Sequence, residues 1–238
     1  MAFMKTNSVD ITVNGQTYNS LTDFGLAIAN TDYLGEPVQD TSNLIAVPGR
    51  SGMLDPTDTV FGGPSYTHRQ IKISFGGLEE PEEWDSVISN LRNLFEGKRV
   101  QLTFATEPDW YWTGRVSIEK FGHNRALGEF DFCINYADPF KTHIDLQSVQ
   151  MFAASGLPDY RHFTVPIHGD NIKLSFAIPE GIEGRLFLEY ADQNYIFYHD
   201  DPDISLMISD NDDQVGIRAA WTNSAGVWVT ASYYDRSL

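Results

Sequence analysis

The chain contains very little cysteine. Cys133 is the one cysteine among 238 residues, which excludes an internal disulfide framework and a cysteine-rich zinc site. It stands between Phe132 and Ile134. We therefore expect a buried thiol that behaves as a small apolar side chain.

Basic residues are also scarce. The chain has 16 Lys and Arg against 33 Asp and Glu, a net charge of −17. The excess divides evenly, since residues 1–140 hold 10 basic and 19 acidic residues (−9) and residues 141–238 hold 6 and 14 (−8). Nucleic-acid phosphates and anionic membranes attract Lys and Arg, so we expect no stable nucleic-acid binding and no attraction to an anionic membrane.

Long apolar runs are missing. The longest, such as 26–29, fall far short of the roughly 18 residues that a membrane span requires. The first residues show no apolar signal segment. We therefore expect a soluble chain without membrane insertion, made and folded in a cytoplasm. Its 42% hydrophobic residues suffice for a packed core, in one large β domain or two smaller domains.

Alternation of apolar and polar residues is the dominant pattern, and it predicts half-buried strands. The apolar positions of the first half fall into five runs: Val9, Ile11, Val13; Ile71, Ile73, Phe75; Val100, Leu102, Phe104; Trp112, Gly114, Val116, Ile118; and Phe130, Phe132, Ile134, Tyr136. The pair Asn14-Gly15 predicts a tight hairpin turn after the first run. The last two runs predict one long antiparallel hairpin that turns at 122–125.

One segment has helical spacing instead. Its apolar residues form a single stripe: Trp84, Val87, Ile88, Leu91, Leu94 and Phe95. Pro81 suits a first helical turn, acidic residues precede the stripe, and Gly97 suits the C-terminal cap. These features predict a helix over 81–96 that packs on one face of a sheet.

Two further segments shape the expected organisation. Residues 24–67 are rich in Gly, Pro, Asp, Thr and Ser, and we expect a long loop that serves as a subunit-contact arm.

A domain boundary is expected at 138–140. The second half contains seven short strand-like runs: 163–167, 172–176, 185–190, 195–198, 205–208, 216–219 and 227–231. The predicted fold is mainly β, with a mixed β domain bearing one amphipathic helix over 1–140 and a β-sandwich or jelly roll over 141–238.

No catalytic constellation is visible. The six histidines form no His-x-x-x-His or His-Glu-x-x-His pair, and nucleophile-elbow, dinucleotide and phosphate-loop motifs are missing. His162 and His168 could share a strand face, but Pro166 lies between them, and solvated or core histidines are favoured. The acidic residues of 200–213 suggest calcium or a solvated turn, and their spacing lacks the ligand loop's glycine and distal glutamate. We expect no enzyme activity and assign no catalytic, cofactor or metal residue.

Aromatic residues gather near the end of the chain. Trp221, Trp228 and Tyr234 are candidates for stacking on a saccharide, as exposed aromatics in lectin-like sandwiches do. The alternative is that they anchor a core or an interface. The sequence leaves both open.

An ordered set of segments resembles the distal tail protein family of long-tailed (siphovirus-type) bacteriophages and prophages. The segments are Val47-Pro48-Gly49-Arg50-Ser51-Gly52-Met53-Leu54-Asp55, the strand from His68 to Phe75, the helix ending Leu94-Phe95-Glu96-Gly97-Lys98, Trp110-Tyr111-Trp112-Thr113-Gly114-Arg115-Val116, and Ala137-Asp138-Pro139-Phe140. The resemblance covers roughly residues 1–140. Residues 141–238 match only as a β-rich appendix of suitable length.

The resemblance implies a structural protein of the virion. Residues 1–140 would form a six-subunit ring at the distal end of the tail, joining the tail tube to the tip proteins and supporting receptor-binding proteins. Residues 141–238 would form a galectin-like or jelly-roll sandwich outside the ring. No cofactor is implied.

Within the resemblance, six residues are candidates for subunit contacts: Pro48, Gly49, Arg50, Gly52, Asp55 and Arg69. Gly49 and Gly52 indicate a tight loop with positive φ. Arg50 could pair with a carboxylate across a subunit boundary or clamp its own loop. If six acidic chains surround a DNA channel, carboxylates facing that channel would repel phosphates.

Two other function classes remain. One is a carbohydrate-binding module that recognises host cell-surface saccharide through Trp221, Trp228 or Tyr234. The other is a hydrolase, for which no recognisable pair of catalytic carboxylates is present.

Overall fold

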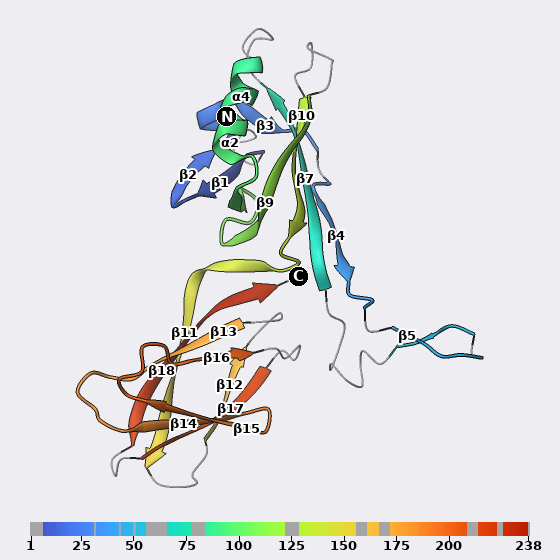
Figure 1. The fold of residues 1–238 in the computed structure, drawn as a ribbon. Helices are drawn as coiled ribbons and strands as arrows, with labels where there is room; N and C mark the ends of the chain where they lie inside the picture. Colours follow the sequence, from blue (N-terminus) through green and yellow to red (C-terminus); the bar gives the residue numbers. More distant parts are fainter. Residues whose placement is uncertain are drawn as a thin grey trace. The chain divides into compact units, whose positions relative to one another are not determined.

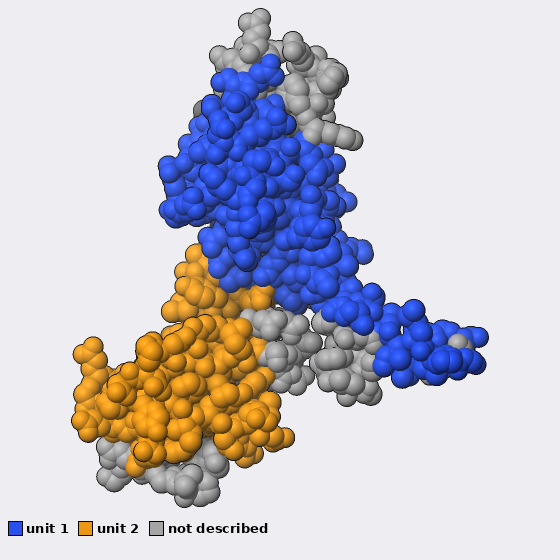
Figure 2. Space-filling view, viewed as in Figure 1, with its two compact units in different colours: residues 1–142, 238 blue, residues 143–237 orange. Residues whose placement is uncertain are grey.

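The computed structural model of the chain describes residues 7–30, 32–42, 44–49, 51–55, 66–77, 84–121, 129–155, 161–166, 172–208, 214–222 and 226–237. The chain divides into two compact units, residues 1–142 with 238 and residues 143–237, coloured separately in Figure 2. The fold is mainly β, as the sequence predicts.

In its described residues, unit 1 combines antiparallel strands with two helices. The elements that lie wholly within it are β1 (Val9–Val13), β2 (Gln16–Asn19), α2 (Ser20–Phe24), β3 (Leu26–Ile28), β4 (Leu34–Gln39), β5 (Ile45–Ala46), β6 (Met53–Leu54), β7 (Tyr66–Gly77), α4 (Trp84–Phe95), β8 (Arg99–Phe104), β9 (Trp110–Phe121) and β10 (Glu129–Ala137). The order β2-β1-β8-β9 continues through β10 to β7, and β3 and β4 pair with β7 (Figure 1).

The predicted alternating runs form strands of this unit. Asn14 and Gly15 take positive φ angles of 51° and 80°, as the predicted tight turn requires. Strands β9 and β10 pair antiparallel, although residues 122–128 lie outside the described part of the chain. Tyr136 differs from the alternation, because a register shift between Ile134 and Ala137 turns Ala137 inward and leaves Tyr136 76% exposed.

The helix predicted over 81–96 is α4, Trp84–Phe95, and residues 81–83 of the predicted range lie outside the described chain. Its stripe enters the core of unit 1 through Ile88, Leu91 and Phe95. Phe95 packs edge-on against Phe132 of β10, with ring centroids 6.1 Å apart. Gly97 ends the helix with a positive φ of 70°.

The expectation of a long bare loop over 24–67 is wrong for its described residues. Strands β3 and β4 pair with β7 there, and β5 and β6 form a small hairpin. The helix α2 was not predicted either, although Asn19 caps it by accepting from the backbone N–H groups of Leu21 and Thr22. Gly25 closes it with a φ of 65°.

Unit 2 is a two-sheet β-sandwich. Its strands are β11 (Lys141–Ser155), which begins in unit 1, and β12 (Arg161–Pro166), β13 (Ile172–Ala177), β14 (Arg185–Tyr190), β15 (Gln193–Tyr198), β16 (Ser205–Ile208), β17 (Gln214–Trp221) and β18 (Val227–Ser237). One sheet has the order β16-β13-β18-β11, and the other has β15-β14-β17-β12, with the end of β11 parallel to β17 (Figure 1). All seven strand-like runs of the second half are confirmed as strands over their described residues, with residue 167 of the first run lying outside them.

Candidate subunit interface and other candidate sites

The first segment of the resemblance, 47–55, contains β6, which pairs with β5 just before the segment to form a hairpin. Its ladder has two register pairs, Ile45 with Leu54 and Ala46 with Met53. Gly49 and Gly52 take φ angles of 82° and 87° in the connecting turn, as expected for a tight loop. We call residues 44–49 and 51–55 the hairpin arm. Arg50 lies outside the described residues.

The hairpin arm exposes apolar side chains. Met53 is 61% exposed, Ile45 51%, Leu54 39% and Val47 37%, and none of the described arm residues is buried. Figures 1 and 2 show the arm projecting from the rest of the described unit 1. Because none of its described residues is buried, this arm lacks the buried face that stabilises an ordinary hairpin. A two-stranded hairpin without such a face is at best marginally stable in water.

Of the other arm candidates, Pro48 and Asp55 are exposed. Together with Gly49 and Gly52 they place four of the six candidate interface residues on the hairpin arm. These positions present backbone and short side chains between the apolar ones, an arrangement suited to contact with another protein surface.

The sixth candidate, Arg69 of β7, lies elsewhere. It is only 8% exposed, and its guanidinium carbon sits 4.5 Å from the centre of the Trp112 ring. Burial lowers the pKa of Arg69. Neither the Nε of Arg69 nor the indole N–H of Trp112 has a hydrogen-bond partner among the described residues. Any intersubunit contact by Arg69 would first require opening of this packing within unit 1.

The three aromatic candidates separate into two environments. Trp221 is 1% exposed and belongs to the core of unit 2, where its indole lies against Gly184. The core alternative therefore holds for Trp221, which has no face for a saccharide. Trp228 is 58% exposed and Tyr234 46%, and both point outward from β18. The Trp228 ring also contacts Phe152, with centroids 5.3 Å apart.

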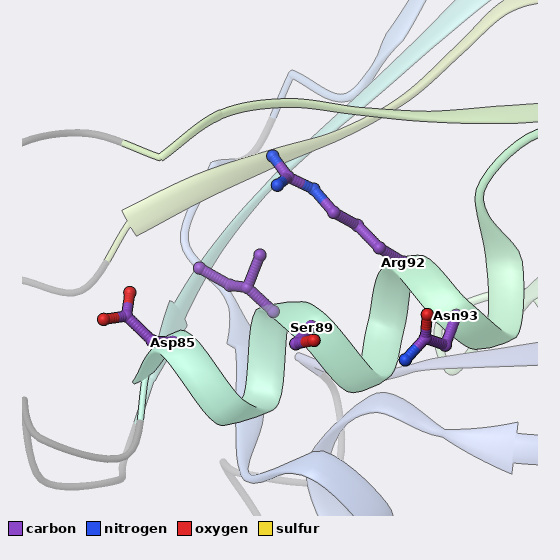
Figure 3. Close-up of a pocket in the computed structure, with 5 residues that line it drawn as sticks. Asp85, Ser89, Arg92 and Asn93 are labelled. Atoms are coloured by element: carbon purple, nitrogen blue, oxygen red, sulfur yellow. The ribbon is translucent and has the colours of Figure 1, made fainter.

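A surface depression of about 430 Å³ lies along α4 (Figure 3). Its described lining residues are Asp85, Ile88, Ser89, Arg92 and Asn93, all from this one helix. Ser89 has no histidine beside it among them to serve as a base, so the residues described there do not form a nucleophilic site.

Metal-ligand candidates do not converge in the described residues, where no group of three or more His, Cys, Asp and Glu side chains could hold an ion. Asp203 pairs instead with Lys173 at 2.7 Å. Asp210, Asp212 and Asp213 lie outside the described residues, as do His168 and the side chain of His162. The described residues do not decide between calcium and a solvated turn for 200–213.

No helix in the described part of the chain has the length and apolar character needed to cross a bilayer.

Comparisons with known proteins identify a shared fold. No protein-family model matches the chain, and no curated protein matches its sequence. A similar solved structure is the crystal structure of the SPP1 Dit (gp 19.1) protein, described as a paradigm of the hub adsorption apparatus in phages that infect Gram-positive bacteria. The likeness has a TM-score of 0.62 at 13% sequence identity and covers 97% of this chain and 99% of that chain. Both units of this chain therefore share the fold of the SPP1 Dit protein.

Proposed function

We propose that this chain is a structural hub protein of a phage tail. Six copies form a ring at the distal end of the tail, which joins the tail tube to the tip proteins and supports receptor-binding proteins. The exposed apolar hairpin arm is the observation that carries this proposal. The fold shared with a phage hub protein over 97% of the chain supports it.

The two units divide the work. Residues 1–140 form the ring, since they include the hairpin arm, and residues 141–238 form an appendage around it. Each hairpin arm docks on the neighbouring copy. Burial of large apolar side chains such as Ile45, Met53 and Leu54 then stabilises each contact by about 1 kcal/mol or more per side chain.

Replacement of the arm's apolar residues tests this role. The combined variant Ile45→Ser, Met53→Ser and Leu54→Ser should have the same melting temperature as the wild type, because these side chains are 51%, 61% and 39% exposed. Size-exclusion chromatography with light scattering should show loss of the hexamer. Unchanged assembly would remove the arm from the interface.

A matched control comes from unit 2. Ile144→Ser, Leu146→Ser and Met207→Ser also replace three apolar side chains, which are 46%, 54% and 58% exposed. This control should assemble as the wild type does. Loss of assembly in both triple variants would show that general surface apolarity, and not the arm, drives association.

Arg50 provides a second test of the same interface. We propose that it pairs with a carboxylate of the neighbouring copy. Arg50→Ala should then yield fewer rings by light scattering, and Arg50→Lys should restore part of them. Full assembly of Arg50→Ala would leave Arg50 without an intersubunit role.

A second candidate function is saccharide binding by unit 2, favoured by the 58% exposure of Trp228. Trp228 and Tyr234 lie six residues apart on one strand face, which corresponds to roughly 20 Å. That spacing suits an extended oligosaccharide better than a single sugar ring. A glycan array on the full chain should give signals that Trp228→Ala abolishes and Tyr198→Ala, on the other sheet, preserves. An array without signal removes this candidate.

A further inference from the structure

Strand β15 forms an edge of the sandwich in unit 2. It pairs with β14 in an unbroken antiparallel register of six residues, and no other described strand pairs with it (Figure 1). Its sequence, Gln-Asn-Tyr-Ile-Phe-Tyr, contains no proline, glycine or charged residue. Natural edge strands are commonly protected by such residues, so β15 lacks the usual means of preventing strand addition.

Two hydrogen bonds show which backbone groups of β15 face the open side. The N–H of His199 donates to the carbonyl of Gly184, just before β14, at 3.3 Å. The N–H of Tyr198 donates instead to the Asp201 carboxylate at 2.7 Å. Along an antiparallel strand, the backbone N–H and C=O groups of successive residues point alternately toward the partner strand and away from it. Odd-numbered residues here therefore face β14, while Asn194 and Ile196 direct their N–H and C=O groups to the open edge.

The open stretch is short and well defined. Both backbone groups of Tyr198 already have hydrogen-bond partners, because its carbonyl also accepts from the Asp201 N–H at 3.1 Å. Asn194 and Ile196 together present two N–H donors and two C=O acceptors to an incoming strand. Ile196 is 52% exposed and stands opposite Phe187 of β14, so an apolar side chain of that strand would pack beside it.

Charge selects among the strands that could dock. Asp192 precedes β15, and Asp200 and Asp201 follow it, with the Asp200 side chain 77% exposed. Residues 143–237 hold 14 acidic and 5 basic residues. A second copy of the chain would bring carboxylates against carboxylates, whereas Lys or Arg at both ends of the incoming strand would meet opposite charge.

We propose that β15 is a docking edge for an extended segment of another protein, with alternating apolar side chains and basic residues at both ends. The segment adds to β14–β15 as a further strand, held by main-chain hydrogen bonds to Asn194 and Ile196. This proposal concerns unit 2 alone and does not depend on ring formation by unit 1.

A synthetic peptide pair tests the proposal on the full chain. The first peptide is Lys-Lys-Thr-Val-Thr-Val-Thr-Lys-Lys, and the second has Glu in place of each Lys. Fluorescence anisotropy at low salt should show the Lys peptide binding about tenfold more tightly, since several exposed ion pairs of small individual strength add together. No binding of the Lys peptide at millimolar concentration, or equal binding of the two, would overturn the proposal.

Variants at one position separate edge docking from simple charge attraction. Ile196→Pro removes an N–H that faces the open edge and leaves the ladder to β14 intact, so binding should be lost while the melting temperature is kept. Ile196→Thr keeps the N–H and should retain binding. If the proline variant fails to fold, Ile196→Lys, which places a cation at the docking position, should weaken binding of the Lys peptide.

Two further results would overturn the assignment. The first is full binding of the Lys peptide by a folded Ile196→Pro or Ile196→Lys variant. The second is self-association of the wild-type chain that Ile196→Pro abolishes, without peptide binding, which would make a second copy the occupant of this edge.

Discussion

Among the described residues of unit 2, the non-glycine residues with positive φ lie in the turn between β14 and β15. Ala191 and Asp192 have φ angles of 49° and 59°, and they connect Tyr190 to its register partner Gln193. This is the two-residue hairpin turn in which both central residues need positive φ, a role that Asn and Gly fill most readily. Alanine has no polar side chain to offset the cost.

Ala191→Gly should therefore stabilise unit 2 by about 1 kcal/mol, because glycine adopts positive φ without a Cβ clash. For a unit of this size the melting temperature should rise by roughly 4 °C. Scanning calorimetry measures the change. Gly226→Ala is the converse control and should destabilise, since a Cβ there would lie 2.6 Å from the Phe152 ring at a φ of 65°.

Cys133 is a buried thiol, as expected, with 1% exposure. Burial raises its pKa to about 11, with the carboxylates of Glu119 and Asp131 adding to the effect. A thiolate is the reactive form, so the folded chain should resist thiol reagents at pH 8 and react once it is denatured. Rapid labelling of the native chain would contradict this burial.

The raised pKa of Cys133 makes the free energy of unfolding depend on pH. The thiol is neutral in the folded state up to about pH 11, whereas its ordinary pKa is 9.0. Between these values the unfolded state alone releases the proton, so this contribution to stability is present below pH 9 and declines as the pH rises toward 11. Cys133→Ala should flatten the decline in urea-unfolding measurements over that window.

At the scale of elements, α4 gives the clearest stability prediction. Leu91 is 1% exposed in the core of unit 1, so Leu91→Asp should destabilise that unit by about 3 kcal/mol or more. Calorimetry should show its transition lost or lowered while that of unit 2 persists. Asn90→Asp adds the same charge at an exposed neighbouring position and should change little. Equal melting temperatures of the two variants would show that the apolar stripe of α4 does not lie in the core.

How well the sequence predicts an element depends on whether burial leaves a regular pattern. Strand β8 and helix α4 bury one face each, so their apolar residues keep a period of two or 3.6. Strand β11 was missed because its apolar residues keep no single alternation: Ile144 and Leu146 are exposed, whereas the buried Met151 and Ala153 fall on the opposite parity. Strand β4 was missed because Gly35 and Pro37 read as loop residues, although the chain pairs with β7 there.

The candidate sites follow the same logic. The strand position of Trp228 was predictable, because Val227 and Val229 flank it and turn inward, which leaves the indole outside. Trp221 continues the alternation of Ile217 and Ala219, so its inward position also has a sequence signal, whereas its contact with Gly184 requires tertiary structure. The open edge at β15 requires sheet order and hydrogen-bond direction, which only tertiary structure provides.

At the scale of the whole molecule, the charge of −17 opposes assembly of six copies. Apolar arm contacts would have to overcome this repulsion. Salt screens it, with a Debye length of about 10 Å at 0.1 M. The hexamer fraction should therefore rise with added salt in light-scattering measurements. A fraction that falls with salt would show that ion pairs, such as one made by Arg50, dominate the contacts.

The acidic charge of the chain also bears on DNA that passes through a ring. We propose that carboxylates of the six copies face the channel of the ring and repel passing phosphates, so that the genome does not adhere. The assembled ring should not retain duplex DNA at physiological salt in a mobility-shift measurement. A channel with a neutral or basic lining in the structure of the ring would contradict this.

The central claim is a ring of six copies built on the hairpin arm. Negative-stain microscopy of the purified full chain, paired with its arm variant, tests it most directly. We expect six-fold rings with a mass six times the 26.8 kDa of the chain, and their loss in the variant Ile45→Ser, Met53→Ser, Leu54→Ser. A wild-type chain that stays monomeric at high concentration and in added salt would contradict it.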